Sequence, residues 1–263
     1  MRLIGLAYRH PLAAWIDTSP PEVRCLEVTA EHFFEGGDPR LRTLASRYPL
    51  FLHGLGMSLG TPGPLDRRTL EQFVRVSKVA DPMWISEHVA FTRAAEIDLG
   101  HLNPIVPDAA TLEVLAEHAS ELSAACGKPL ILENITSHLA LRGDMSETEF
   151  LNRLCERADC GLLLDVTNLY INARNHRFDA RRWLRELDGS RIVQLHIVGY
   201  AHHDGAWQDR HGAPVQEDLL DLAREVVAYA PGVKAVIVER DENFPPPEEM
   251  AAELRRLEAA LGD

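Results

Sequence analysis

Short apolar runs alternate with longer segments of helical periodicity along most of the 263-residue chain. Eight of these runs predict β-strands, and most are continuous in apolar residues, as in strands that are buried on both faces of a parallel sheet. The predicted strands span residues 3–8, 25–33, 50–54, 83–91, 129–134, 161–168, 191–199 and 233–241.

The segments between these runs predict helices. The clearest span residues 66–80, 108–126, 146–158, 178–188, 215–229 and 246–261. Ser146 followed by Glu149 resembles a capping box at the start of one helix, and Pro246 suits the first turn of the last.

Eight strand–helix units in a chain close to ~250 residues predict a TIM (β/α)8 barrel, formed as a single domain by residues 1–263. A doubly wound open sheet is the alternative fold. It normally has a glycine-rich phosphate loop after its first strand, whereas "AYRHPLAAW" follows here.

Composition narrows the range of partners. The chain has 27 Lys and Arg against 40 Asp and Glu, a formal charge of -13, which argues against nucleic acid as the main partner. Its four cysteines are scattered without a CxxC pair, as expected of a reduced, cytoplasmic protein without a disulfide framework. No apolar run approaches the roughly 20 residues of a membrane span, and we expect no membrane partner.

A barrel places its chemistry at the carboxyl ends of its strands, and those positions are rich in metal-ligand types here. Five carboxylates or imidazoles directly follow apolar residues, in "LFLH", "LILE", "LLLD", "VQLH" and "AVIVE". They are His53, Glu133, Asp165, His196 and Glu239. Further candidates at or beyond the strand ends are Glu27, Glu31, Glu87, His88, His101, Asn134, Asn168, Asp209, His211 and Asp241.

Each of these residues alone has an ordinary structural explanation, such as a hydrogen-bonded core histidine or a carboxylate paired with arginine. Together they need a compensating cation, because burying even one unpaired charge costs several kcal/mol. Imidazole and carboxylate donors without a strand-end cysteine suit Fe, Mn, Zn or Co. The number of donors suggests two or three ions that share bridging carboxylates. Such a centre serves hydrolytic or isomerising chemistry in one class of barrel and oxidative chemistry in another.

Nine ordered segments resemble a known family, the multinuclear non-heme iron-dependent oxidative enzymes, which includes the methanobactin-biosynthesis oxidase. The segments, between about Leu3 and Asp241, are "IGLAYRH", "LEVTAEHFF", "LHGLGMSLG", "ISEHVAF", "LENITS", "LDVTNLYINA", "QLHIVGY", "DRHGAPV" and "VERD". The resemblance implies a TIM barrel with two or three irons that uses O2 to oxidise a ribosomally made precursor peptide, usually at cysteine and sometimes at Asp or Asn. It also implies a small partner protein that binds the leader peptide.

The resemblance further implies how the ligands divide. One iron site would use His53, His88 and Glu133, and a neighbouring site Asp165, His196 and Glu239. Asp209 and His211, with Asn168, would complete the cluster. Glu27, Glu31 and Glu87 would orient ligand imidazoles.

Three positions depart from the pattern of the family. They are Thr167, Tyr200 and Arg240, of which the last two are expected to change the polarity of the pocket.

The segment "AWQDRHGAPVQ" (206–216) has the composition of a loop. We interpret it as a lid in which Asp209 and His211 point inward from an extended stretch while Arg210 faces away. Gly212 and Pro214 would set its turn into the next helix.

Two other functions remain open. One is a divalent-metal barrel isomerase or phosphodiesterase, similar to xylose isomerase or endonuclease IV and working with Zn, Mn or Mg. A phosphodiesterase would be expected to have a basic groove, which the charge disfavours. The other is a metal-binding or scaffold protein without enzymatic activity.

Overall fold

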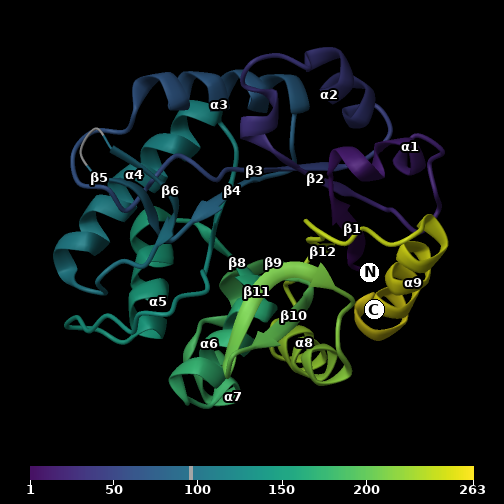
Figure 1. Ribbon diagram of the computed structural model, residues 1–263. Coiled ribbons are helices and arrows are strands. Elements are labelled where there is room, and N and C mark those ends of the chain that lie inside the picture. Colours follow the sequence, from purple (N-terminus) through teal and green to yellow (C-terminus); the bar gives the residue numbers. More distant parts are fainter. Residues whose placement is uncertain (95–96) are drawn as a thin grey trace.

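The computed structural model describes residues 1–94 and 97–263, and its centre is a closed barrel of eight parallel strands (Figure 1). In order around the barrel, the strands are β1 (Leu3–Ala7), β12 (Ala235–Val238), β9 (Ile192–Ile197), β8 (Gly161–Asp165), β7 (Leu130–Glu133), β4 (Ile85–His88), β3 (Leu50–His53) and β2 (Leu26–Thr29). The TIM barrel predicted from the apolar runs is confirmed, and every predicted strand contains one of these eight.

Helices surround the barrel (Figure 1). They are α1 (Ala13–Ile16), α2 (Asp38–Ala45), α3 (Arg67–Ala80), α4 (Ala109–Cys126), α5 (Glu147–Ala158), α6 (Val166–His176), α7 (Ala180–Glu186), α8 (Glu217–Tyr229) and α9 (Pro247–Leu261), with short 3-10 turns at His10–Leu12, Ala30–Phe33 and Gly189–Arg191. All six predicted helices are present, and the Ser146 hydroxyl caps α5 by accepting from the backbone N–H of Glu149 (3.1 Å).

The predicted strand 161–168 is too long, because its last three residues begin α6. The Asp165 carboxylate accepts a hydrogen bond from the backbone N–H of Asn168 (2.7 Å) and so caps this helix. A side-chain acceptor at this position satisfies an N–H that the first turn of a helix leaves free. Asp165 therefore ends the strand and starts the helix.

Side chains inside the barrel form an apolar layer beneath a polar one. The buried cluster Ala7, Cys25, Phe51, Trp84, Ile131, Leu163, Ala235 and Ile237 fills the lower layer. Phe51 and Trp84 stack there with their ring centroids 4.2 Å apart. Successive strand residues point to opposite faces, so the residue two positions after an interior apolar residue also points inward. This alternation brings the polar side chains at the strand ends together above the apolar layer.

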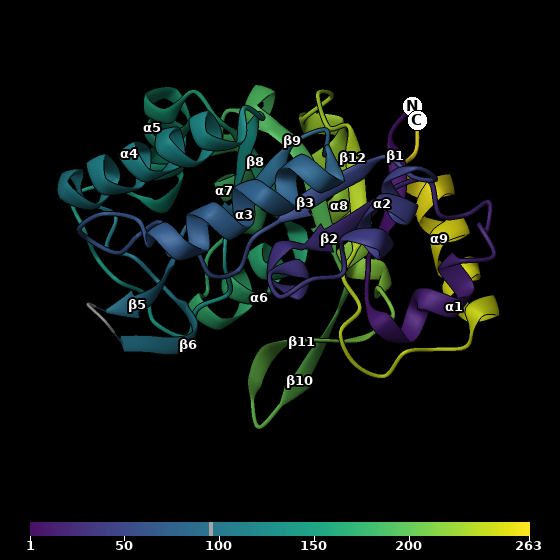
Figure 2. The same cartoon turned by 90° about the horizontal axis from the view of Figure 1, so that it is seen from above.

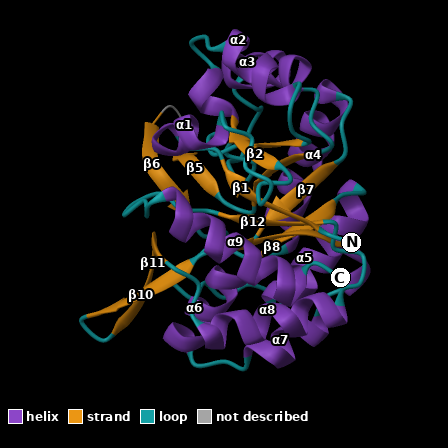
Figure 3. Cartoon of the chain, turned by 90° about the vertical axis from the view of Figure 1, so that its right-hand side faces the viewer, coloured by secondary structure: helices purple, strands orange, loops and turns teal. Residues whose placement is uncertain are grey.

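Two hairpins extend from the rim of the barrel at which the carboxyl ends of its strands lie. They are β5 (Phe91–Ala94) with β6 (Ile97–Asn103), and β10 (Gly199–His203) with β11 (Ala206–Ala213). Figure 2 shows both on the side opposite the termini, and Figure 3 shows β10–β11 projecting beyond the helices. The loop expected at 206–216 is therefore largely strand β11. Asp204 and Gly205, with φ of 51° and 78°, form the tight turn that pairs it with β10.

Among the described residues, no helix combines the length and apolar composition needed to cross a membrane. The four cysteines are free thiols, and three of them are buried.

Candidate metal centre

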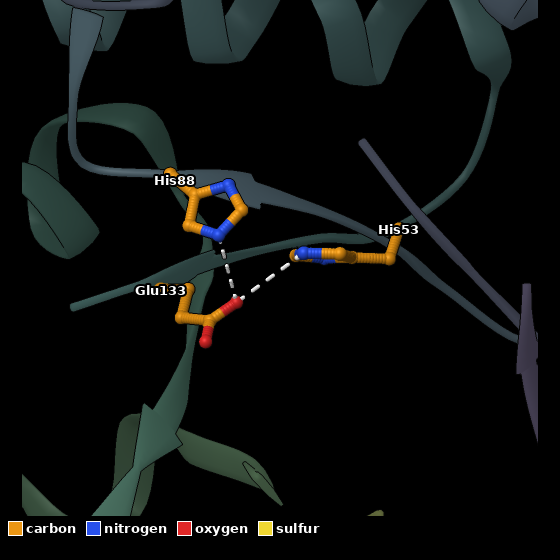
Figure 4. Close-up of side chains that lie close together, drawn as sticks. All are labelled: His53, His88 and Glu133. Carbon is orange, nitrogen blue, oxygen red and sulfur yellow. Dashed lines mark ion pairs between the residues drawn. The ribbon is translucent and has the colours of Figure 1, made fainter. Parts of the chain in front are cut away.

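His53, His88 and Glu133 meet at the rim from three neighbouring strands, and all three are buried (Figure 4). The Glu133 Oε2 atom lies 3.5 Å from Nε2 of His53 and 3.4 Å from Nε2 of His88. Glu133 Oε2 has no hydrogen-bond partner among the described residues. A buried carboxylate oxygen that faces two imidazole nitrogens in this way can share a cation with them.

A second buried group consists of Glu133, Asp165, His196 and Glu239. The Nδ1 atom of His196 lies 3.1 Å from Oε1 of Glu133 and 3.3 Å from Oε2 of Glu239. Since the other carboxylate oxygen of Glu133 faces His53 and His88, this residue belongs to both groups. The geometry therefore fits two cation positions bridged by one carboxylate.

Neighbouring side chains fix which imidazole nitrogens face the centre. Nε2 of His196 lies 2.8 Å from Oε1 of Glu27, and Nδ1 of His53 lies 2.8 Å from the Ser86 hydroxyl. A carboxylate only accepts, so Nε2 of His196 donates to Glu27. Nδ1, which faces Glu133 and Glu239, is the nitrogen that a cation held by these two carboxylates would contact. Below them, Gln194 donates to Glu27 (2.5 Å) and accepts from the Trp84 indole (2.7 Å), which joins the polar layer to the apolar floor.

Hairpin β10–β11 brings Asp209 and His211 to the rim through a bulge. Gly199 pairs with Ala213 and Ala201 with Gln208, so four residues of β11 lie opposite one residue of β10. Bulges of this kind redirect side chains beside active sites. The prediction that Asp209 and His211 lie in an extended stretch is wrong at His211, whose φ is 52°.

Within the bulge, Nε2 of His211 lies 2.7 Å from Oδ1 of Asp209. Arg210 points away, as predicted, and its guanidinium pairs with Glu242 (3.1 Å). The backbone carbonyl of His211 accepts from the N–H groups of Asp241 (2.9 Å) and Glu242 (3.3 Å). These bonds hold a left-handed conformation that a residue with a side chain rarely adopts.

The surroundings of the buried Asp165 carboxyl favour a nearby cation. Burial raises its pKa well above the ordinary value, and the nearby carboxylates of Asp209 and Glu133 raise it further, against the opposing effect of His196 and His211. One of its oxygens, Oδ2, lacks a hydrogen-bond partner among the described residues. A cation beside Asp165 would remove both penalties.

The imidazoles respond differently to the same surroundings. Burial lowers the pKa of His53, and the attraction of Glu27 and Glu133 only partly offsets it. Burial also lowers the pKa of His88, but the carboxylates of Glu133 and Glu87 outweigh it and raise the pKa to about 9. His88 thus holds a proton at neutral pH in a position where a metal ion would replace it.

The other predicted residues occupy the periphery of the centre. Asn168 lies at the start of α6, where its amide nitrogen donates to the Asn134 carbonyl (3.1 Å) and its amide oxygen accepts from the Thr136 hydroxyl. Glu87 accepts from the backbone N–H groups of Met57 (2.8 Å) and His88 (2.6 Å) and lies 3.5 Å from Nδ1 of His88.

Glu31 accepts from the backbone N–H groups of Leu55 (2.9 Å) and Gly56 (2.8 Å), so it holds the loop after β3. His101 lies on the exposed strand β6, where Nδ1 contacts the carbonyl of Leu99 (2.7 Å). Arg240 pairs with Glu253 of α9 (3.2 Å) and is buried there, which accounts for its presence between two rim acids.

Sequence reasoning missed Arg9, Ser86 and Gln194. Arg9 follows β1 and contacts both Glu239 and Asp241. Its position directly after the first apolar run was an available signal, because it matches the positions of the acids at the other strand ends. Ser86 and Gln194 lie two residues before His88 and His196 on the same inward faces.

The fold and the site together define a (β/α)8 barrel with buried His and carboxylate clusters at the carboxyl ends of its strands, and these clusters can hold metal ions. The chain belongs to the family described as "RiPP precursor modification enzyme MbnB/TglH/ChrH", which matches residues 3–262. The family relationship inferred from the nine ordered segments is thereby confirmed, and it indicates an enzyme.

Relatives of similar length come from several bacteria, and each is described as a UPF0276 protein. The chain is 34% identical over 258 residues to that of Rhizorhabdus wittichii, which covers 96% of this chain and 92% of the relative. It is 35% identical over 266 residues to that of Bordetella parapertussis (98% and 92%) and 34% identical over 261 residues to that of Chromobacterium violaceum (98% and 94%).

Solved structures show the same fold at low sequence identity. A D-psicose 3-epimerase, solved in the presence of D-fructose, has a TM-score of 0.65 at 13% identity and covers 99% of this chain and 100% of its own. An L-ribulose 3-epimerase has a TM-score of 0.64 at 12% identity, with 99% and 96% covered. These likenesses support the barrel fold alone.

Proposed function

We propose that this protein is a multinuclear non-heme iron enzyme that uses O2 to oxidise a residue, most often cysteine, of a ribosomally synthesised precursor peptide. The family supports a peptide substrate. The observation that carries the proposal is the Glu133 carboxylate, which faces His53 and His88 with one oxygen and His196 with the other. Mixed imidazole and carboxylate donors around a shared carboxylate suit adjacent iron ions.

The ligands divide as follows under this proposal. His53, His88 and Glu133 hold one ion, and Glu133, Asp165, His196 and Glu239 hold a second. Asp209 and His211, whose Oδ1 and Nε2 atoms lie 2.7 Å apart, hold a third. Asn168 joins them only if its amide oxygen leaves Thr136. Bound iron supplies one-electron redox chemistry and open positions for O2 and the substrate.

The chain's own residues position and insulate this centre. Glu27 and Ser86 orient the imidazoles of His196 and His53. The apolar layer that contains Phe51 and Trp84 closes the barrel below the centre and excludes water from that side. No side chain at the rim is assigned as a general base.

The substrate and partner follow from the same proposal. The precursor peptide would approach the rim on the side where β5–β6 and β10–β11 project. A small separate protein would bind its leader segment. The most direct way to name the peptide is to test short cysteine-rich peptides encoded beside this gene.

Metal analysis and O2 consumption test the proposal. Protein purified without oxygen is expected to contain two to three irons per chain, with Mössbauer signals of coupled iron, and to consume O2 when the precursor peptide is added. His211→Ala should lower both metal content and O2 consumption. Arg210→Ala is the matched control, since Arg210 is adjacent on β11 but points away.

One outcome would overturn the proposed function, and another would overturn the assignment of β11 to the centre. Stoichiometric zinc, with no iron and no O2 consumption, would favour a divalent-metal isomerase or phosphodiesterase. Unchanged iron content and O2 consumption in His211→Ala would show that β11 does not belong to the centre.

A further inference from the structure

Arg9 places a fixed positive charge at the edge of the candidate metal centre. It directly follows Tyr8 after β1, and its side chain is 15% exposed. Its guanidinium contacts Oε1 of Glu239 (3.0 Å) and Oδ1 of Asp241 (2.5 Å). It also donates to the carbonyl of Tyr8 (3.2 Å) and the hydroxyl of Thr29 (3.4 Å), so hydrogen bonds to four residues hold the guanidinium in place.

Asp241 connects this charge to His211. While Oδ1 of Asp241 is bound to Arg9, Oδ2 lies 2.9 Å from Nδ1 of His211. Nε2 of His211 faces a second carboxylate, with Oδ1 of Asp209 at 2.7 Å, so without a cation both nitrogens donate. Because Asp241 is already bound by Arg9, the Asp209 side is the one on which a cation can take the place of the proton, at Nε2. Carboxylates commonly orient ligand imidazoles in this way.

His211, Glu239 and Asp241 would by spacing alone make a third metal group. Arg9 argues against an ion among them, because its guanidinium already binds both carboxylates of this group. A second cation there would be repelled by a charge that cannot be removed by deprotonation. The group is therefore a support for His211, and the ion it serves lies on the Nε2 side.

We propose that Arg9 is a positioning residue: it holds Asp241 and Glu239 so that His211 binds a metal ion through Nε2, together with Asp209. The inference rests on the proposed metal centre but requires neither iron nor O2 chemistry. It assigns a structural role to Arg9 and to Asp241, and it assigns Nε2 of His211 to the metal ion.

The test is an anaerobic Fe(II) titration of metal-free protein without peptide, with bound metal measured by mass spectrometry. Arg9→Met should weaken the His211-dependent ion by about 10–100-fold, as His211→Ala does, and leave binding at His53, His88 and Glu133 unchanged. Arg9→Lys keeps the charge without the forked geometry and should restore part of the affinity. Arg181→Met, which removes an exposed arginine paired with Glu225, is the control.

Circular dichroism and the melting temperature of each metal-free variant separate positioning from misfolding. If Arg9→Met folds normally and binds every ion as tightly as wild type, the inference is wrong. A wild-type protein without any His211-dependent ion would also overturn it. The proposed oxidase function fails separately, because a missing reaction with peptide and O2 leaves the result of the metal titration intact.

Discussion

His88 and Glu133 are register partners on the neighbouring parallel strands β4 and β7, and Nε2 of His88 lies 3.4 Å from Oε2 of Glu133. Asp165 and His196 are the corresponding partners on β8 and β9. Paired positions of parallel strands lie at the same level along the barrel axis, so these four side chains lie in one layer. Most of the candidate ligands therefore depend on strand register, whereas Asp209 and His211 depend on a hairpin.

Replacing the shared carboxylate should remove more metal than replacing a ligand of one ion. Glu133→Gln is expected to weaken both ions of the buried groups, because Glu133 belongs to each group, whereas His53→Ala should weaken only one. Metal content after anaerobic reconstitution measures the difference. Equal losses in the two variants would contradict a bridging role for Glu133.

Hairpin β10–β11 is held to the barrel by aromatic packing. The ring of Trp207 lies 5.7 Å from that of Tyr170 and 4.8 Å from that of Tyr200, and the guanidinium of Arg174 lies over it at 5.5 Å. Trp207→Ala should increase hydrogen exchange in residues 199–213 and weaken the ion bound by His211, roughly tenfold.

Tyr200→Phe is the matched control for that experiment. It keeps the ring that stacks on Tyr170 at 4.9 Å and removes only the hydroxyl that donates to Asp218 (3.0 Å). Its hydrogen exchange should stay close to wild type. A larger effect for Tyr200→Phe than for Trp207→Ala would show that the Asp218 bond, and not the packing, holds the hairpin.

Without metal, the stability of the protein should fall at alkaline pH. The folded-state pKa of His88, about 9, exceeds its unfolded value of about 6.5. Charged His88 thus contributes fully to stability below about pH 6.5, and this contribution is lost as the pH rises through about 9, on the order of 3 kcal/mol. Urea unfolding of metal-free protein across this window measures the loss. His88→Gln should flatten the profile, and an unchanged slope in that variant would assign the effect elsewhere.

Gly5 is required for the close approach of β1 to β2. A Cβ at this position would lie 2.2 Å from the carbonyl oxygen of Cys25, a backbone atom that cannot move without disturbing the barrel. Gly5→Ala should therefore lower the free energy of unfolding by at least ~1–3 kcal/mol. Gly232→Ala serves as control, since its nearest atoms are 3.9 Å away, and urea unfolding should place it near wild type.

The barrel and its strand-end residues could be predicted because both follow from local pattern. In runs such as "LILE" and "LLLD", the apolar residues predict a buried strand, and the charged residue that follows them marks the position where the strand ends. The hairpins are less apparent, although Asp204-Gly205 is a strong hairpin signal. It was missed because the polar residues that follow it have the composition of a loop.

Other features depend on contacts between distant parts of the chain. Arg9 contacts Glu239 and Asp241 at separations of 230 and 232 residues, and no local pattern links them. The left-handed backbone of His211 is likewise held by the N–H groups of Asp241 and Glu242. The Arg9 contacts and the backbone conformation of His211 therefore depend on the tertiary structure that forms when the barrel closes.

That closure also sets an order of assembly. Arg9 follows β1, Glu239 and Asp241 follow β12, and these two strands pair directly. On the ribosome, β12 emerges last of the eight barrel strands. Until then a growing chain can offer the His53, His88 and Glu133 ligands but has neither the Glu239 carboxylate nor the support for His211. Under the proposed function, the full set of ions would therefore bind only after the first and last barrel strands have paired.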